Sequence, residues 1–504
     1  MAITGDCVTA FVEIGNIQDV VMDRVGISSW PKPLLFLSVM FAAYSPVLFV
    51  PFAYRDDYVV LYDALRHRMK PMAEMTMGFG RPVEAVFNWL AFGAMHGVSD
   101  LAYLRAISIA GIAALGFAFY QTLRSTRLPP AATIGASLLI GLMPPFQVYA
   151  AWAVAVSCPW SALMAGIAFR LVDHSQPGSR AWWRAAGACV LLIASIMIYQ
   201  PTAMMFWVFA ASVWLTAPQF PESGRIVRSG VTMGVALLAD YGLVTGIQYA
   251  YGIVLPRDSL VGDIPEKIAW FFRDALRDAL NLPLIFPEGW VAWTVAAFVV
   301  SGLWLYFPGR WRDRAVRTAL AAVLVPLSYL PNLMAKENSA SYRTQSALTG
   351  LILLYAAIAL VSWLQTARRS HLLPICATVA VVGCAALASR NVLVEFALPQ
   401  SLEYHFLAYA IRPSELADGK PIYFILSQWQ KDQLAPLTPH EFGALSSGAV
   451  WEPPAMAWLI LHARNSGRAT PVPSRILAGP APAPKGYSVI DLRSALHDWT
   501  GQHQ

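Results

Sequence analysis

Two adjacent carboxylates, Asp56 and Asp57, stand in the stretch YRDDYVVLYD, directly after twenty residues that carry no charge. A partly desolvated aspartate beside a second one has its pKa raised, toward the range in which a carboxylate takes a proton from a substrate hydroxyl. The neighbouring Arg55 acts on that pKa in the opposite direction. The simpler interpretation is a solvated acid pair at the end of a helix, and the pair alone does not decide between the two.

A basic turn follows the acids in the same loop. In MGFGRPVEAVFNW, Gly78, Gly80, Arg81 and Pro82 form a tight turn of restricted backbone. Arg81 comes about 25 residues after the acid pair, and guanidinium groups bind phosphate with paired hydrogen bonds. The same loop also carries the basic residues Arg55, Arg66, Arg68 and Lys70. This loop is therefore predicted to bind an anion, for which phosphate is the best candidate.

Two further segments carry polar residues beside apolar runs. Tyr199 and Gln200 precede Pro201, where Gln200 either binds a sugar hydroxyl or satisfies carbonyls freed at a broken helix. In MAKENSASYRTQSAL, Lys336 and Arg343 either neutralise a lipid phosphate or reach toward lipid headgroups.

Asp240 is an acid near the middle of the apolar run ALLADYGLV. Such a residue is by default functional or paired. Arg105 or a tyrosine hydroxyl on a neighbouring helix is the expected partner, and a structural polar contact is the favoured interpretation.

The composition identifies the element type that must position these residues. Hydrophobic residues make up 57% of the 504 residues and charged residues 13%, where soluble domains have about 25% charged residues. The net charge of +6 comes from short basic clusters between apolar runs, a placement that orients membrane helices and does not indicate a nucleic-acid partner. The five cysteines form no CxxC pair, so neither a disulfide framework nor a zinc site is expected.

Apolar runs predict an all-α polytopic membrane protein with about eleven transmembrane helices. A cytoplasmic N-terminus puts five basic clusters on the inner side, as the positive-inside rule requires, if 83–97 lies along the interface or dips into the membrane without crossing it. The first span is expected to stay in the mature protein, because the preceding segment is acidic. The predicted spans are 33–52, 99–122, 128–147, 150–170, 184–200, 202–217, 229–254, 286–306, 318–334, 344–366 and 372–389.

This topology predicts three parts of the chain. Residues 1–32 are a cytoplasmic segment, 33–390 a transmembrane domain with its first outer loop at 53–98, and 391–504 a small extracytoplasmic α/β domain. The last part contains the strand-like PIYFILSQW, the helix-like PPAMAWLILHARN and the Pro-rich, extended linker PVPSRILAGPAPAPKG. The acid pair and Arg81 are thereby placed on the outer side, where basic residues run against the positive-inside trend.

An acidic pair opening a long first outer loop, followed by a GRP turn, resembles the GT-C class of integral membrane glycosyltransferases. Within that class DDY, FGRPVEAVFNWL, IMIYQPTAMMF and SYRTQSALTGLILLY are similar, in order and sidedness, to the Gtr-type (GtrII-like) glucosyltransferases that modify O-antigen. The resemblance covers roughly residues 35–365. It does not extend to the C-terminal domain.

The resemblance implies transfer of a hexose, with glucose favoured, from a polyprenyl-phosphate carrier to a glycan hydroxyl on the periplasmic face of a bacterial inner membrane. Asp56 or Asp57 would be the base, with class analogy favouring Asp56. The other acid would orient the acceptor or hold a divalent cation, and metal dependence stays open. Arg81, Arg343 and Lys336 would stabilise the phosphate as its charge develops.

Two alternatives remain. A transporter or flippase of a lipid-linked sugar would use Asp240 for ion coupling. An O-antigen polymerase or ligase shares the chemistry and would use a large outer loop in the second half, for which 255–285, with Arg257, Asp258, Asp263 and Glu266, is the candidate.

Overall fold

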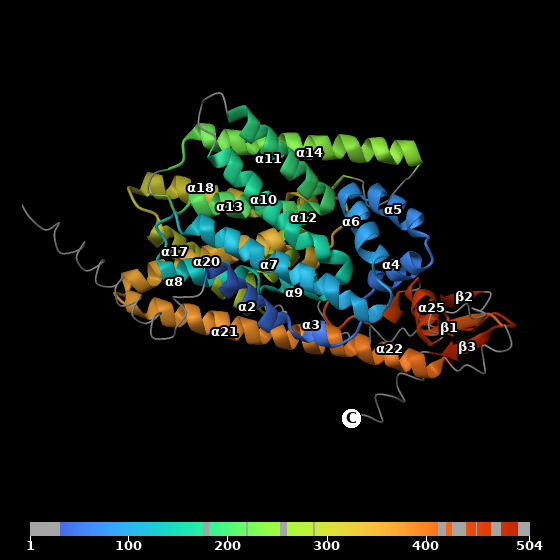
Figure 1. The fold of residues 1–504 in the computed structure, drawn as a ribbon. Helices are drawn as coiled ribbons and strands as arrows, with labels where there is room; N and C mark the ends of the chain where they lie inside the picture. Colours follow the sequence, from blue (N-terminus) through green and yellow to red (C-terminus); the bar gives the residue numbers. More distant parts are fainter. Residues whose placement is uncertain are drawn as a thin grey trace, which may run out of the picture.

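The computed structural model describes residues 31–174, 181–217, 220–252, 260–285, 288–411, 420–425, 440–449, 451–464 and 475–491. Most of these residues are helical, and the helices form one packed body (Figure 1). The predicted cytoplasmic segment up to residue 30, together with Arg257 and Asp258, lies outside the described residues.

All eleven predicted spans coincide with helices, although several are too short to cross a bilayer alone. Among the described residues, six helical segments are long and apolar enough to span, and a seventh arises if α8 and α9, bent by 46°, form one broken span. The breaks follow the sequence: Pro46 begins α3, Pro144 begins α9 and Pro201 interrupts the turn before α13. The multi-pass architecture is thereby confirmed, whereas a count of eleven spans is not.

The helices of the body have the following bounds: α2 Lys32–Tyr44, α3 Pro46–Phe49, α7 Leu101–Leu123, α8 Pro130–Ile140, α9 Pro144–Ala151, α10 Cys158–Asp173, α11 Ala181–Ile198, α12 Gln200–Ala203, α13 Met205–Trp214, α14 Ser223–Tyr251, α15 Ile264–Trp270, α16 Leu276–Leu280, α17 Gly289–Tyr306, α18 Trp311–Leu327, α19 Leu330–Met334, α20 Ser346–Thr366, α21 Leu373–Val392 and α22 Leu398–Ala410. Short 3₁₀ turns lie among them, including η2 Ala153–Ser157 and η5 Tyr342–Thr344. The π-helical segment η7 Leu393–Ala397 joins α21 to α22, so that the two run on as one long helix along the lower edge of Figure 1.

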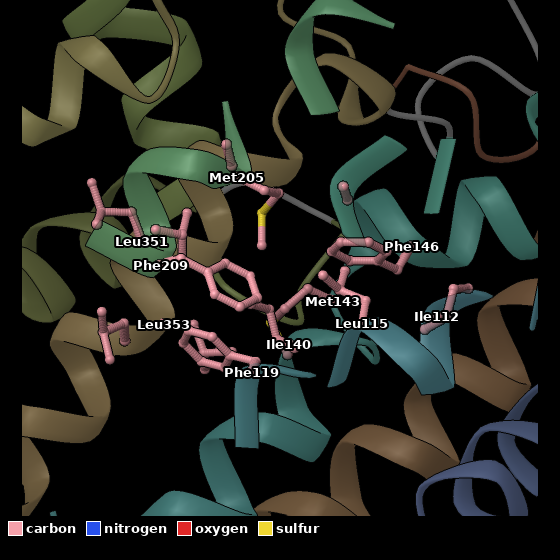
Figure 2. Packing of buried hydrophobic residues seen from close by; sticks show 14 of the residues in the cluster. Ile112, Leu115, Phe119, Ile140, Met143, Phe146, Met205, Phe209, Leu351 and Leu353 are labelled. Carbon is pink, nitrogen blue, oxygen red and sulfur yellow. The ribbon is translucent and has the colours of Figure 1, made fainter. Parts of the chain in front are cut away.

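The core lies between α7, α8, α9, α13 and α20. Figure 2 shows how side chains of these helices interdigitate, with Phe119 and Phe209 in edge-to-face contact at 5.3 Å between ring centroids. Gly166 lets α10 and α13 approach closely, because a Cβ there would stand 2.5 Å from the Phe209 ring. Tight packing of this kind is expected between membrane helices, because the hydrophobic effect does not drive their association inside the bilayer.

The segment 53–98, predicted as the first outer loop and called by that name below, folds into three short helices, α4 Asp56–Leu65, α5 Met69–Gly78 and α6 Pro82–Gly93. Twelve residues make α6 about 18 Å long, which is too short to cross a bilayer core of about 30 Å. The segment expected at 83–97 is therefore a short helix packed on its neighbours. A second apolar core joins these three helices to the C-terminal part of the chain.

The C-terminal part contains α25 Glu452–Arg464 and strands β1 Ile422–Ile425, β2 Ile476–Gly479 and β3 Ser488–Asp491. The strands form a parallel sheet in the order β2-β1-β3, with Ile422 opposite Ile476 and Ser488. Strand β2 falls within the segment expected to be an extended linker. Helix α25 packs against α4, which places this part beside the first outer loop at one end of the molecule (Figure 1).

One of the two partners expected for Asp240 is wrong. Arg105, the alternative to a tyrosine hydroxyl, instead has its guanidinium beside Asp57, and Gln200 is a neighbour of Asp240. The reason is that the first outer loop folds back over the end of α7 and brings its own buried acid to Arg105.

Candidate active site

Asp57 is a fully buried acid whose oxygens are occupied by its own fold. It accepts hydrogen bonds from the backbone N–H groups of Tyr54 (3.0 Å), Ala153 (3.3 Å) and Val154 (2.8 Å). The guanidinium of the equally buried Arg105 lies 3.8 Å away. Burial raises the pKa of Asp57 to about 6, although Arg105 and these three donors act against the rise. The residue fastens the start of α4 to α7 and η2.

Asp56, the first residue of α4, has a different environment. It is half-buried, and its carboxylate makes no hydrogen bond or ion pair within the part of the chain that the structure describes. The preceding Arg55 has φ 44° and ψ −120°, a strained conformation for a residue with a side chain, and its N–H donates to the Ser446 hydroxyl at 2.8 Å. The strained backbone at Arg55 therefore sets the position of Asp56, whose carboxylate is unpaired among the described residues.

The GRP turn presents Arg81 at the start of α6. Gly80 has φ 79°, which glycine adopts without strain, and Pro82 begins the helix. The Arg81 guanidinium lies over the Tyr199 ring, 4.5 Å from its centroid, and 3.5 Å from the Glu84 carboxylate. The expectation of a tight turn at Gly80 is confirmed.

Arg343 reaches the site from η5. Its guanidinium lies over the Trp152 ring, 5.0 Å from the centroid, and its Nε is 3.6 Å from the buried carboxylate of Glu441. The Tyr149 hydroxyl donates to the Arg343 carbonyl and fixes the backbone there. Burial alone would lower the pKa of Arg343, but Tyr199, Glu441 and Asp56 outweigh it, so that the guanidinium stays charged.

The two arginines act on the same groups. Burial raises the pKa of Glu84, Arg81 and Arg343 both lower it, and Asp56 raises it further. Burial likewise raises the pKa of Tyr199 to about 12, with Arg343 and Arg81 both acting against the rise. Arg81, Arg343, Glu84, Tyr199 and Asp56 therefore belong to one electrostatic cluster, built from α4, the GRP turn, η5 and the α11–α12 junction.

This cluster holds buried polar atoms that lack hydrogen-bond partners among the described residues. They are Nε of Arg81, Oε2 of Glu84, Nε of Arg343 and Oε1 of Glu441. Buried polar atoms in native proteins are nearly always paired, so each exception requires an explanation. Two buried guanidinium N–H groups that make no hydrogen bond to the described residues are a feature expected of a site that binds an anion.

An apolar pocket adjoins the turn. It has a volume of about 160 Å³ and lies between α5 and α6, the helix that begins directly after Arg81. Its lining is entirely apolar, made by Ala73, Met77, Ala85, Val86, Trp89 and Leu90. Of these, Leu90 is 71% exposed and Val86 56% exposed.

The remaining predicted site residues are placed differently. Tyr199 is buried under Arg81, and the Gln200 amide donates to the Gly80 carbonyl at 3.2 Å. Lys336 is exposed, and its ammonium makes no hydrogen bond or ion pair with the described residues. The lysine bound to that loop is Lys267, whose ammonium donates to the Glu337 carbonyl and the Asn338 side chain.

Sequence reasoning missed three acids. Glu84, three residues after Arg81, was readable from helical spacing. Glu441 and Glu452 carried no signal, because they lie far along the chain and approach the site only through the packing of the C-terminal part. Glu452 is fully buried, and neither of its carboxyl oxygens has a hydrogen-bond partner among the described residues.

The candidate cation ligands were Asp56 and Asp57. In the ranges that the structure describes, no group of three or more His, Cys, Asp or Glu side chains is arranged to hold a metal ion. The backbone N–H groups that bind the Asp57 carboxylate leave fewer of its oxygen lone pairs for a cation.

Comparison with known proteins yields distant structural similarity. No protein-family model matches the sequence, and no curated protein matches it. The oligosaccharyltransferase of Archaeoglobus fulgidus, in complex with Zn and sulfate, is similar with a TM-score of 0.42 and 12% identity, over 79% of this chain and 60% of that one.

The archaeal oligosaccharyltransferase AglB from Archaeoglobus fulgidus, in complex with an inhibitory peptide and a dolichol-phosphate, is similar with a TM-score of 0.42 and 13% identity, over 80% of this chain and 63% of that one. The chain thus spans less than two thirds of the length of these structures. Similarity at this level assigns no residue of the site.

Proposed function

We propose that this chain is a membrane glycosyltransferase that moves a hexose, with glucose the expected sugar, from a polyprenyl-phosphate donor to a hydroxyl of a cell-surface glycan such as O-antigen. The observation that carries the proposal is the pair Arg81 and Arg343, which act electrostatically on the same groups and whose buried Nε–H groups make no hydrogen bond among the described residues; the carboxylate of Asp56 belongs to the same cluster. A cationic cradle next to a base fits transfer from an anionic leaving group.

In the proposed reaction the acceptor hydroxyl oxygen attacks the anomeric carbon of the hexose, and Asp56 takes the hydroxyl proton. The bond between the anomeric carbon and the phosphate oxygen breaks, and its electron pair stays on the phosphate. Arg81 and Arg343 stabilise the charge that develops there. Attack opposite the leaving group inverts the anomeric configuration. In this scheme Asp57 positions Asp56 and takes no proton from the acceptor.

The lipid part of the donor is supported by the apolar pocket. Helix α6 links the two features directly, since Arg81 precedes its first residue and Ala85 to Leu90 line the pocket. A carrier lipid with its phosphate at Arg81 would therefore have apolar surface within two helical turns. This arrangement favours a lipid-linked sugar over a nucleotide sugar.

The test is a transfer assay with purified protein. We expect hexose transfer to the glycan from polyprenyl-phosphate hexose and none from the corresponding nucleotide hexose. Efficient transfer from the nucleotide sugar without lipid would contradict the proposal.

We further propose a multi-pass location in a bacterial inner membrane, with the N-terminus in the cytoplasm and the C-terminus in the periplasm. A topology reporter fused after residue 504 should report a position outside the cytoplasm. A reporter fused after residue 125 should report a cytoplasmic position. Cytoplasmic activity at both positions would displace the site from the outer face.

A further inference from the structure

Helix α14 has one face that contacts the GRP turn. It is a 29-residue helix, and most of its apolar side chains, such as Leu238 at 72% exposed, face away from the protein. Asp240, Val244 and Gln248 are more enclosed than these side chains, Asp240 being buried and the other two half-buried. They are spaced four residues apart and therefore share one side of the helix. The end of α14 lies next to α5 in Figure 1.

Each member of this face, which we call the 240/244/248 face, reaches the backbone of the turn. The Gln248 amide donates to the Gly78 carbonyl at 3.0 Å. A Cβ added to Gly80 would stand 2.9 Å from Cγ2 of Val244 and 3.0 Å from Nε2 of Gln200. Asp240 lies one step away, next to the Gln200 side chain, whose amide donates to the Gly80 carbonyl at 3.2 Å.

The chemistry of these groups fixes their orientation. An ionised carboxylate only accepts hydrogen bonds, so Gln200 must turn its NH₂ group toward Asp240. The same NH₂ group has a second N–H, which meets the Gly80 carbonyl. Asp240 thus determines which end of the Gln200 amide faces the turn, and the peptide after that carbonyl belongs to Arg81.

We propose that Asp240 and Gln248 are positioning residues, which through the 240/244/248 face of α14 and the Gln200 amide hold the Gly78–Gly80 turn so that Arg81 faces the donor phosphate. The inference rests on the proposed function, because it assigns these contacts to donor binding. It also gives a buried acid within a membrane helix a role that requires no ion movement.

Donor kinetics test the role of the face. Asp240→Leu removes the hydrogen-bond acceptor, and Gln200→Met removes the donor while keeping a side chain of similar length. We expect each variant to raise the KM for polyprenyl-phosphate hexose roughly tenfold, because a buried polar group loses its partner. The kcat should change less than about twofold. Asp240→Asn keeps an acceptor oxygen and should restore KM to within about threefold of wild type, whereas an ion-coupling acid would not tolerate the amide.

Leu238→Ala, two residues away on the exposed side of the same helix, is the matched control and should leave both constants unchanged. An unchanged KM in both Asp240→Leu and Gln200→Met, or a fall in kcat at constant KM, would overturn the inference. A failure of the wild-type protein to use the lipid donor would instead count against the proposed function.

Hydrogen exchange tests the inference without any substrate. In the turn, the Gly80 N–H donates to the Met77 carbonyl at 2.9 Å and the Arg81 N–H to the Thr76 carbonyl at 3.2 Å. In bilayer-embedded protein, exchange at these two amides should speed up at least tenfold in Asp240→Leu and Gln200→Met, and not in Leu238→Ala. Wild-type exchange in both variants would show that the face does not hold the turn, whatever the enzyme transfers.

Discussion

The Glu441 carboxylate lies 3.6 Å from Nε of Arg343, so that an acid of the C-terminal part orients a cation of the site. Its other oxygen accepts the Tyr342 N–H at 3.0 Å, and the Glu441 carbonyl accepts the Tyr54 hydroxyl at 2.9 Å. A single residue therefore ties η5 to the start of the first outer loop. Packing of the C-terminal part therefore contributes directly to the site.

Glu441→Ala should weaken donor binding, because the Arg343 side chain loses the acid that orients it. We expect the donor KM to rise roughly tenfold, near the lower end of what one charge-assisted contact supplies. A double-mutant cycle measures this coupling: once Arg343→Ala is present, Glu441→Ala should have little further effect. Fully additive effects would contradict the pairing.

Asp56→Asn should abolish most transfer while leaving the fold intact. The carboxylate makes no hydrogen bond or ion pair within the described part of the chain, so its loss costs little stability, but a general base typically contributes about 10²-fold or more. The measurements are the transfer rate and the amount of folded protein in the membrane. A rate within a fewfold of wild type would remove Asp56 from the mechanism.

Asp57→Asn should act on stability. An amide presents an NH₂ group to backbone donors and leaves the Arg105 charge buried without its counter-ion, a change that costs about 3 kcal/mol or more. We expect a lower Tm and less folded protein, with Asp56→Asn as the matched comparison one residue away. If Asp57→Asn protein is as stable as wild type and inactive, Asp57 takes part in the chemistry directly.

The acid pair illustrates how far sequence could go. The pattern DDY followed by GRP located the loop, and apolar runs located every span as a helix. Sequence could not separate Asp56 from Asp57, because the difference arises from donors at residues 153 and 154 and from Arg105, all distant in the chain. Glu441 was out of reach for the same reason. The predicted span lengths were wrong where proline and glycine interrupt helices within apolar runs that are continuous in hydropathy.

Glu452 provides a test at varied pH. Burial, and then Asp56, raise its pKa to about 10, whereas an unfolded glutamate has a pKa of about 4.3. The folded state therefore binds a proton that the unfolded state loses, and this group costs stability progressively as pH rises above about 4. Glu452→Gln should raise the Tm at pH 7–8, by the equivalent of about 2–4 kcal/mol at most.

That advantage should disappear as the pH falls toward 4. Glu74→Gln, at a partly exposed carboxylate beside Lys70, is the control and should leave the Tm nearly unchanged throughout. A lower Tm for Glu452→Gln at pH 7–8 would mean that the Glu452 carboxyl is ionised and bound by a partner.

Binding of the lipid phosphate to both arginines is tested most directly by measuring the affinity of the purified protein for polyprenyl phosphate without sugar. Arg81→Ala and Arg343→Ala should each weaken binding roughly tenfold or more, as expected for the loss of a charge-assisted contact. The exposed Lys336→Ala is the control and should bind as wild type does. Wild-type affinity in both arginine variants would contradict a shared phosphate site.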